Sequence, residues 1–474
     1  MQTGHNLATL FMLAILLLTG CKNDTDTGSP SQDPDAGTDL TGDSSSTSDS
    51  ESQSESTLDS SSEDDSETEH TPPDLPNTCH LDRGQTAASE KDDWSSDTKG
   101  DGRSPEIVHG SQTLMIWRYL SVAEDAAWEI QVAPFDPEPD GGLPGPDPGP
   151  PGPVVTPASP GPLSLYPKAA ANDAVFGVTW QDGRWDLTCE ADTFTKCGRE
   201  IAFLTVDSVG LPLGGSVPLQ ITMGGNIATG PAIAGTNKGY IVVWAEKTQS
   251  AATVMAISIA KNGTLGTPKQ ISVEDGADHK RRAEVAAIGN VAVVVWGTNG
   301  QSEILARTLD ENAEPQGDIN VVYDAGGCLL PNIAAGSSSF LVSWGQSTPS
   351  DYEIFLRKLD KNGIPIDAER QATWSLSDNI SSAMAWNGDT FAMAWQSTKN
   401  NGTEDCLVDS CNNQILAALF DENGDIQSAP VRLSNDPNPV GDFDVAWDGS
   451  GWTALYELPR FERRQIFYGR MVCD

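Results

Sequence analysis

Short runs of alternating apolar and polar residues recur along this chain, most clearly in residues 231–270. An apolar run leads through a polar turn to alternating aliphatic residues that end on Trp244. A second alternating run follows, then a turn near Asn262 and Gly263 and a last short apolar run. An alternation with a period of two is the mark of a β-strand with two different faces. The segment therefore predicts four short strands.

The same pattern returns about seven times. Its second strand ends on an aromatic residue in every copy, and these residues are Trp117, Trp180, Trp244, Trp296, Trp344, Trp395 and Tyr456. Four antiparallel strands per unit of about 50 residues, repeated in series, are typical of a β-propeller. We therefore predict an all-β chain with a single propeller of about seven four-stranded antiparallel blades. Six or eight blades stay open if an insertion hides or mimics a unit.

The repeated aromatic residues have two interpretations, a stacking platform for a ligand or packing between blades. A blade has one apolar face for each neighbour and is not stable alone, so large aromatic side chains are needed between blades. We predict that these residues form the core between blades.

The predicted third strands each end on an Asp that opens a turn, at 207–210, 310–313, 360–363 and 421–424. Such a turn can resemble part of a calcium loop, but the remaining ligands and the closing Glu of an EF-hand are missing. An Asp followed by Asn and Gly is also ordinary hairpin-turn chemistry. The hairpin turn is the favoured interpretation.

The ends of the chain predict how the ring closes. The last unit supplies its third strand at 465–472, and the sequence then ends at Asp474. Residues 77–105 precede the first repeat and are free to supply the missing fourth strand. Cys79 and Cys473 would then lie on neighbouring strands, where a disulfide can hold the ring shut.

The N-terminal segment, residues 1–21, has the features of a secretory signal peptide. Its apolar run from Leu7 to Leu18 is too short to span a bilayer. It ends in Leu-Thr-Gly-Cys, which resembles the lipobox of bacterial lipoproteins and implies lipidation of Cys21. Lys22 after the cysteine implies, by the same resemblance, the outer membrane. The alternative is a cleaved signal with a coincidental cysteine, because the first six residues contain no Lys or Arg.

Residues 22–78 contain 16 acidic residues, one Lys and no Trp, Tyr or Phe. Low hydrophobicity with a run of like charges predicts disorder. A flexible coil of this length spans roughly 40 Å, so it suits a tether between a membrane and a folded domain at 79–474. Weak calcium binding by the scattered carboxylates is the alternative.

The formal net charge of the chain is −40, with 68 acidic and 28 basic residues. This excess argues against nucleic acid as the main partner, because phosphate binding needs Lys and Arg. From about residue 100 onward, the blade pattern resembles that of secreted bacterial propeller lipoproteins. The resemblance implies a fold and a location in the cell envelope, and says little about the ligand. We expect a monomer that is anchored to the membrane by lipid.

The remaining cysteines fit an oxidising compartment. Cys189 with Cys197 and Cys406 with Cys411 are two predicted pairs within single long loops, which leaves Cys328 over. Metal binding is disfavoured because there is no CxxC spacing, and we expect no cofactor. The Pro/Gly-rich stretch 136–163 interrupts the first blade after its third strand. It lacks the glycine period of collagen and predicts an extended solvated loop, with a ligand for a Pro-binding domain as the alternative.

The long predicted loops between second and third strands open on one face of a propeller, together with the connections between blades. Loops on a rigid scaffold often carry function. On this face the sequence places several cationic residues and Trp185, which we expect to be exposed. The candidate ligand face consists of Arg184, Trp185, His279, Lys280, Arg281, Arg282, Arg460, Arg463 and Arg464. The alternative is that these cations only offset neighbouring acids.

Recognisable catalytic motifs such as GxSxG, HExxH and a phosphate-binding glycine loop are absent from the sequence. We therefore predict a binding or scaffold module for a protein or glycan partner rather than an enzyme. A propeller hydrolase that acts on extracellular polysaccharide is the alternative, because two carboxylates suffice for glycoside hydrolysis. A purely structural surface protein is a third class.

Overall fold

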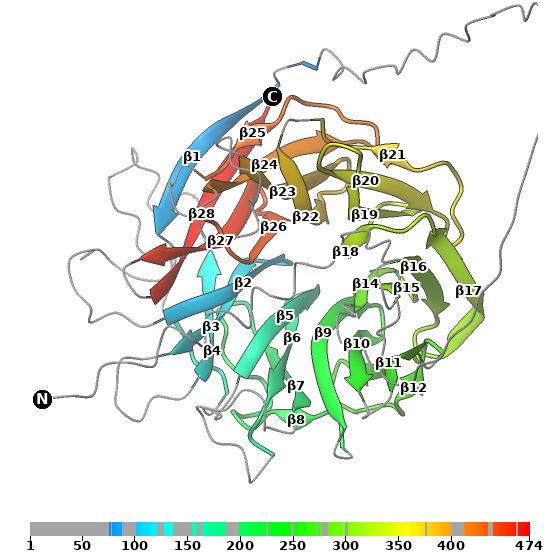
Figure 1. Cartoon of the computed structure of the whole chain (residues 1–474). Coiled ribbons are helices and arrows are strands. Elements are labelled where there is room, and N and C mark those ends of the chain that lie inside the picture. The colour runs from blue at the N-terminus through cyan, green and yellow to red at the C-terminus, as the bar shows by residue number, and fades with distance from the viewer. Residues whose placement is uncertain are drawn as a thin grey trace, which may run out of the picture.

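The alternating runs form seven antiparallel sheets arranged as blades around a ring, as Figure 1 shows. The computed structural model describes residues 75–76, 78–87, 101–120, 128–135, 154–158, 164–185, 199–223, 226–247, 251–273, 275–276, 283–298, 302–374, 377–399, 412–434, 439–460 and 463–474. These residues contain strands and turns but no helix, and hence no helix able to cross a membrane. The predicted propeller of seven blades is confirmed.

The strands follow the predicted order in each blade. Blade 1 contains β2 (Asp101–His109), β3 (Thr113–Leu120) and β4 (Trp128–Phe135), and blade 2 contains β5 (Ser164–Asn172), β6 (Val175–Asp182), β7 (Glu200–Val206) and β8 (Leu219–Gln220). Blade 3 contains β9 (Ile227–Thr236), β10 (Gly239–Lys247), β11 (Ala251–Ala260), β12 (Lys269–Gln270) and β13 (Asp275–Gly276), and blade 4 contains β14 (Ala283–Ile288), β15 (Val291–Gly297), β16 (Ile304–Leu309) and β17 (Pro315–Tyr323).

The second half of the ring repeats this order. Blade 5 contains β18 (Cys328–Ala335), β19 (Phe340–Ser347), β20 (Tyr352–Leu359) and β21 (Arg370–Gln371), and blade 6 contains β22 (Asp378–Trp386), β23 (Phe391–Lys399), β24 (Asn412–Phe420) and β25 (Val431–Arg432). Blade 7 contains β26 (Phe443–Trp447), β27 (Trp452–Arg460), β28 (Arg463–Cys473) and, from the other end of the chain, β1 (Cys79–Ala87).

The alternation within a strand sends neighbouring side chains to opposite neighbouring blades. In β10 of blade 3, Ile241 and Val243 pack with Trp296 of blade 4. Val242, between them in the sequence, packs on the other side with Phe203 of blade 2. Each buried aliphatic side chain stabilises the fold by about 1.5–3 kcal/mol, so the blades hold one another in place.

The seven repeated aromatic residues are buried in the seven clusters between blades. None of Trp117, Trp180, Trp244, Trp296, Trp344, Trp395 and Tyr456 is more than 2% exposed. Each packs against the blade that precedes its own in the ring. Their predicted role as core residues is confirmed.

The ring closes in blade 7 through a strand from each end of the chain. Strand β1 pairs with β28 in antiparallel register, with Cys79 opposite Cys473, and the two cysteines form a disulfide. Figure 1 shows the blue strand β1 along the red strand β28. The predicted closure and disulfide are both confirmed.

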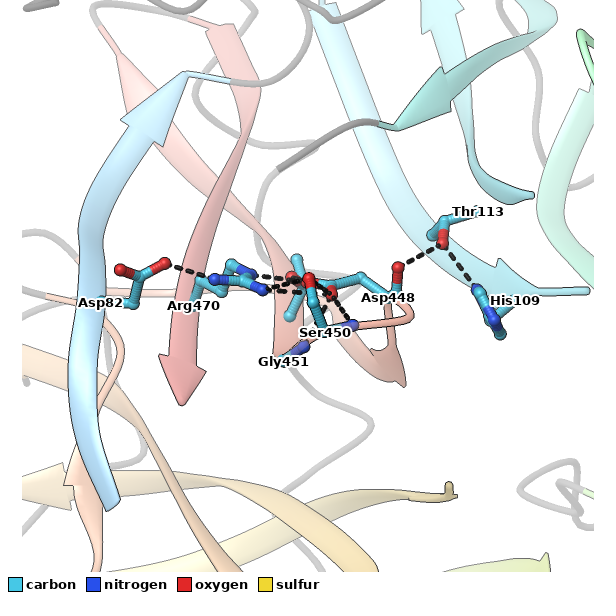
Figure 2. Close-up of polar contacts among 8 residues, drawn as sticks. Asp82, His109, Thr113, Asp448, Ser450, Gly451 and Arg470 are labelled. Carbon is cyan, nitrogen blue, oxygen red and sulfur yellow. Dashed lines mark hydrogen bonds and ion pairs between the residues drawn. The ribbon is translucent and has the colours of Figure 1, made fainter. Parts of the chain in front are cut away.

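A buried polar network supports this closure (Figure 2). Arg470 in β28 donates from Nε to Oδ2 of Asp448 at 2.7 Å and also pairs with Asp82 of β1. The backbone carbonyl of Asp448 accepts a hydrogen bond from Thr113 of blade 1 at 3.4 Å, and Thr113 in turn contacts His109. Burial raises the pKa of Asp448, but its bonds with Arg470 outweigh this effect, and the pKa is lowered. The network therefore joins β1, blade 7 and blade 1.

The third-strand Asp residues form hairpin turns, as predicted. Oδ1 of Asp360 accepts hydrogen bonds from the backbone N–H groups of Asn362 and Ile364, at 2.8 and 2.9 Å. Gly363 has a φ of 70°, which suits glycine in such a turn. The turns that begin at Asp207, Asp310 and Asp421 repeat both side-chain bonds.

These turns also connect neighbouring blades. Glu422 in the Asp turn of blade 6 accepts hydrogen bonds from Ser337 Oγ and from the backbone N–H of Ser338 in blade 5, both at 2.8 Å. Glu311 in the Asp turn of blade 4 pairs with Lys238 of blade 3. The residue after the Asp thus belongs to a contact between blades.

The first strand of a blade lies nearest the centre of the ring, and we call it the innermost strand. In four blades this strand contains a bulge in which a residue with positive φ precedes a proline. These residues are Ser104 (φ 50°), Tyr166 (φ 50°), Gly230 (φ 58°) and Leu330 (φ 43°). A β-bulge re-aims side chains, and a non-glycine residue with positive φ is strained. Ser104 and Tyr166 lie in the adjacent blades 1 and 2, and Leu330 lies in blade 5.

The Pro/Gly-rich stretch 136–163 lies outside the described residues except at 154–158. Val155 forms an isolated antiparallel bridge with Val132 of β4, with both N–O distances at 2.8 Å. The end of the insertion therefore occupies the place of a fourth strand in blade 1.

Candidate functional site

One face of the ring carries the connections between second and third strands. We call it the 2–3 face, and define it by the ends of β3, β6 and β27 and the starts of β2, β5 and β26 in blades 1, 2 and 7. Of the candidate residues predicted from the sequence, the structure describes Arg184, Trp185 and Arg464 on this face. The opposite face carries the Asp turns.

Arg184 is not a free cation on this face. Its Nη2 pairs with Oδ2 of Asp182 at 2.8 Å, and its backbone N–H donates to Oδ1 of the same residue. Its guanidinium carbon lies 5.6 Å from the ring centroid of Trp185. Trp185 is half-buried against the core between blades 1 and 2, rather than exposed as expected.

Arg464 is also paired with a carboxylate. Its Nη1 lies 2.6 Å from Oε1 of Glu457, and its backbone N–H donates to Asp101 at 2.8 Å. For Arg184 and Arg464, the geometry agrees with the alternative that the cations offset neighbouring acids.

The other candidate residues lie wholly or partly outside the described part of the chain. These are His279, Lys280, Arg281 and Arg282, the side chains of Arg460 and Arg463, and the cysteines Cys21, Cys189, Cys197, Cys406 and Cys411. Cys328 is buried in the core between blades 4 and 5.

Arg118 occupies a different position on the same face. It follows the repeated Trp117 in β3 and is only 8% exposed. Its guanidinium carbon lies 4.7 Å from the ring centroid of Trp128 in β4 and 5.7 Å from that of Tyr166 in β5. Among the described residues its side chain forms no ion pair, and its buried Nε has no hydrogen-bond partner. Burial lowers the pKa of Arg118.

The carboxylates near Arg118 are bound to other donors. Asp101 accepts two bonds from Arg103, and Glu457 accepts from Arg464 and from the backbone N–H of Ser104. Burial, followed by the charge of Asp442, raises the pKa of Glu457. Glu457 and Asp442 act on Arg118 electrostatically, but neither forms a hydrogen bond with its guanidinium.

Tyr166 supplies an exposed aromatic surface beside this cation. It has 41% of its surface exposed, and its positive φ belongs to one of the bulges that end in proline. The pairing of β5 with β6 shifts its register between Leu165 and Lys168, around Tyr166. Backbone strain of this kind persists only where the surroundings hold it, and it is common at binding sites. Arg118, Trp128 and Tyr166, which we call the arginine–aromatic cluster, are the best-formed candidate site.

A second polar group lies on the innermost strands of blades 7, 1 and 2. Glu106 of β2 pairs with Lys168 of β5 at 2.8 Å, and Asp444 of β26 lies close enough to affect it electrostatically. Burial, and then the charge of Asp444, raise the pKa of Glu106 to about 8. Among the described residues, no three His, Cys, Asp or Glu side chains are placed to hold a metal ion.

Comparison with known proteins yields similarity in solved structures alone. No protein-family model matches the sequence, and no curated protein matches it. The Trypanosoma rangeli sialidase in complex with sialic acid aligns with a TM-score of 0.40 and 11% identity, over 84% of this chain and 57% of that chain. The ectodomain of the parainfluenza virus 5 hemagglutinin-neuraminidase aligns with a TM-score of 0.41 and 11% identity, over 67% and 84%.

Kuenenia stuttgartiensis hydrazine synthase aligns with a TM-score of 0.38 and 12% identity, over 61% of this chain and 76% of that chain. This chain spans a little over half the length of the sialidase. Similarities this weak, to proteins as different as a sialidase and a hydrazine synthase, carry no argument about activity.

Proposed function

We propose that this protein is a lipid-anchored lipoprotein of the bacterial cell envelope, in the outer membrane, whose propeller binds a protein or glycan partner on the 2–3 face. The lipobox-like sequence that ends at Cys21 and the acidic segment 22–78 support the anchor and the tether. Apart from residues 75, 76 and 78, both segments lie outside the described part of the chain. Several acyl chains on one cysteine would suffice for stable anchoring.

One observation carries the binding proposal: a nearly buried cation, Arg118, lacks an ionic partner among the described residues. Removing a charge from water is costly unless an opposite charge or hydrogen bonds compensate it. The rings of Trp128 and Tyr166 provide part of this compensation through cation–π contacts. An acidic group of a bound partner would provide the rest.

The binding test uses the full chain with Cys21→Ser, so that the protein can be immobilised without lipid. Arg118→Gln and Tyr166→Ala are compared with wild type for binding to a glycan array and to purified envelope proteins. The control is Arg432→Gln, which removes an exposed arginine on the outer strand of blade 6. We expect partner binding to be lost in the two cluster variants alone. Equal binding by all four proteins would refute the site.

The anchor is tested separately by metabolic labelling with radioactive palmitate. Wild type is expected to take up the label and to sediment with outer membranes. Cys21→Ser should do neither. Label on the Cys21→Ser variant would remove the anchor from the proposal.

The alternative function, a hydrolase that acts on extracellular polysaccharide, has one observation in its favour. Glu106 has a raised pKa and lies near a second carboxylate, Asp444, as acid and base groups of glycosidases do. However, Glu106 is paired with Lys168, so its carboxyl group already has a partner within the protein and is not free to protonate a glycosidic oxygen. Release of reducing ends from polysaccharides by wild type, and its loss in Glu106→Gln, would establish this alternative.

A further inference from the structure

We infer that the ligand of the arginine–aromatic cluster is a saccharide with a single carboxylate on its ring, such as a uronic acid residue. This inference rests on the proposed binding function and adds the chemical class of the ligand. It combines the unpaired hydrogen-bonding capacity of Arg118, the exposed ring of Tyr166 and the acidic surroundings of both.

The guanidinium of Arg118 has the geometry to bind a carboxylate, because its N–H donors form a planar fork that matches the two oxygens of that group. In this structure the fork is held in place by two aromatic rings, at 4.7 and 5.7 Å, so little side-chain freedom is lost when an anion binds. The buried Nε without a hydrogen-bond partner shows that the described protein groups do not use the full donor set.

The charges around Arg118 favour a ligand with a single negative charge. Asp101 and Glu457 are already paired with Arg103 and Arg464, so these two cations are not available to a ligand. Asp442 acts on Arg118 electrostatically, and its charge repels a ligand with several negative charges more strongly than one with a single charge. A sulfated or phosphorylated polyanion is therefore disfavoured, and one carboxylate is favoured.

The exposed ring of Tyr166 indicates what the rest of the ligand is. Tyr166 is 41% exposed, and its ring centroid lies 5.7 Å from the guanidinium carbon of Arg118. An exposed aromatic surface next to an anion site suits a rigid ring with apolar C–H groups, which buries area at a small entropic cost. A pyranose that bears a carboxylate presents both features within one residue.

The experiment measures binding of the methyl glycoside of galacturonic acid, which carries one carboxylate, to the full chain with Cys21→Ser by isothermal titration calorimetry. The matched ligand is the same glycoside with its carboxylate methyl-esterified, which keeps the ring and removes the charge. The same glycoside with several sulfate groups on its hydroxyl oxygens tests the charge argument. Wild type should bind the acid at least about tenfold more tightly than the ester and the sulfated sugar.

The variants assign the binding to the cluster. Arg118→Gln should abolish the preference for the acid over the ester, and Arg118→Lys should restore only part of it, because an ammonium lacks the planar fork. Tyr166→Ala should weaken both acid and ester, because it removes the stacking surface and leaves the cation. Arg432→Gln should bind as wild type does. Circular dichroism spectra identify any variant that fails to fold, and the exposed Tyr166 gives a second test if Arg118→Gln does so.

Two results would overturn the inference. One is equal affinity of wild type for acid and ester, and the other is an acid preference that survives in Arg118→Gln. No binding of any acidic saccharide would also exclude this ligand class. If the cluster variants then still lose a protein partner or a neutral glycan, the proposed function holds and the ligand class alone is wrong.

Discussion

Replacing Glu106 with glutamine tests how the innermost strands of blades 7, 1 and 2 are held together. Glu106 is nearly buried, pairs with Lys168 and lies near Asp444. Burial and the neighbouring acid raise the pKa of Glu106 to about 8, from 4.5 without these effects. Near neutral pH the folded protein therefore keeps a proton on Glu106, and the unfolded chain has lost it. A glutamine side chain at this position would keep the shape of the neutral acid and cannot ionise.

Proton linkage determines the sign and the size of the pH effect on the free energy of unfolding. Between pH 4.5 and pH 8 the native state binds one more proton at this site than the unfolded state does, so wild-type stability falls as the pH rises. Each pH unit in this window costs about 1.4 kcal/mol, and the whole window up to about 5 kcal/mol. Below pH 4.5 Glu106 is protonated in both states and the cost vanishes. We expect Glu106→Gln to match wild type at the acidic end and to exceed it increasingly up to pH 8.

The assay is urea unfolding followed by tryptophan fluorescence, from pH 4.5 to pH 8.5 at fixed ionic strength. The control is Glu369→Gln, which changes an exposed carboxylate in blade 5 and should run parallel to wild type. A Glu106→Gln profile that also runs parallel to wild type would refute the raised pKa. A variant that is less stable by a constant amount would mean that an ionised Glu106 forms a stabilising ion pair with Lys168.

Three further predictions concern the closure of the ring and the turns. Replacing both Cys79 and Cys473 with Ser removes a cross-link between positions 394 residues apart. By loop-closure entropy such a cross-link stabilises the fold by roughly 5–6 kcal/mol, so the urea midpoint should fall well below that of wild type. An unchanged midpoint would show that the disulfide adds no stability. Arg470→Met leaves the buried Asp448 without its cation and should cost about 3–5 kcal/mol in thermal unfolding, part of which Asp448→Asn should recover in the double variant. Asp360→Ala removes the acceptor of two backbone hydrogen bonds and should cost about 1 kcal/mol in chemical denaturation, whereas a calcium-dependent loss would support a cation site there.

The fold could be predicted from the sequence because the repeated residues are packing residues. Trp244 and its equivalents recur where each blade needs a large side chain against its neighbour, and the period of two specifies which face that side chain takes. The closure was predictable because the last unit lacked one strand and the first repeat was preceded by unused residues. The packing signal is local and recurs in every repeat, whereas the closure signal occurs once and follows from the strand order of a closed ring.

The arginine–aromatic cluster could not be found in the same way. Arg118, Trp128 and Tyr166 come from three strands, and their contacts depend on a bulge that turns Tyr166 toward blade 1. The one available signal for the bulge was a proline that recurs in several innermost strands, directly after residues such as Tyr166 and Leu330. Charge alone was misleading for Arg184, because the acid two residues before it takes up its guanidinium.

The position of the disulfide also determines how the propeller responds to mechanical force. Cys79 is the first residue of β1, so its disulfide with Cys473 is the first covalent cross-link that a pull on the preceding chain meets among the described residues. Without a covalent bond there, β1 would peel from β28 one hydrogen bond at a time, which needs little force. With the bond, tension passes directly from the N-terminal segment into the last residues of the chain, and the ring is stretched as a whole. A protein that is held by its N-terminal segment and bound to a partner through its propeller therefore resists a force that would separate β1 from β28 if hydrogen bonds alone closed the ring.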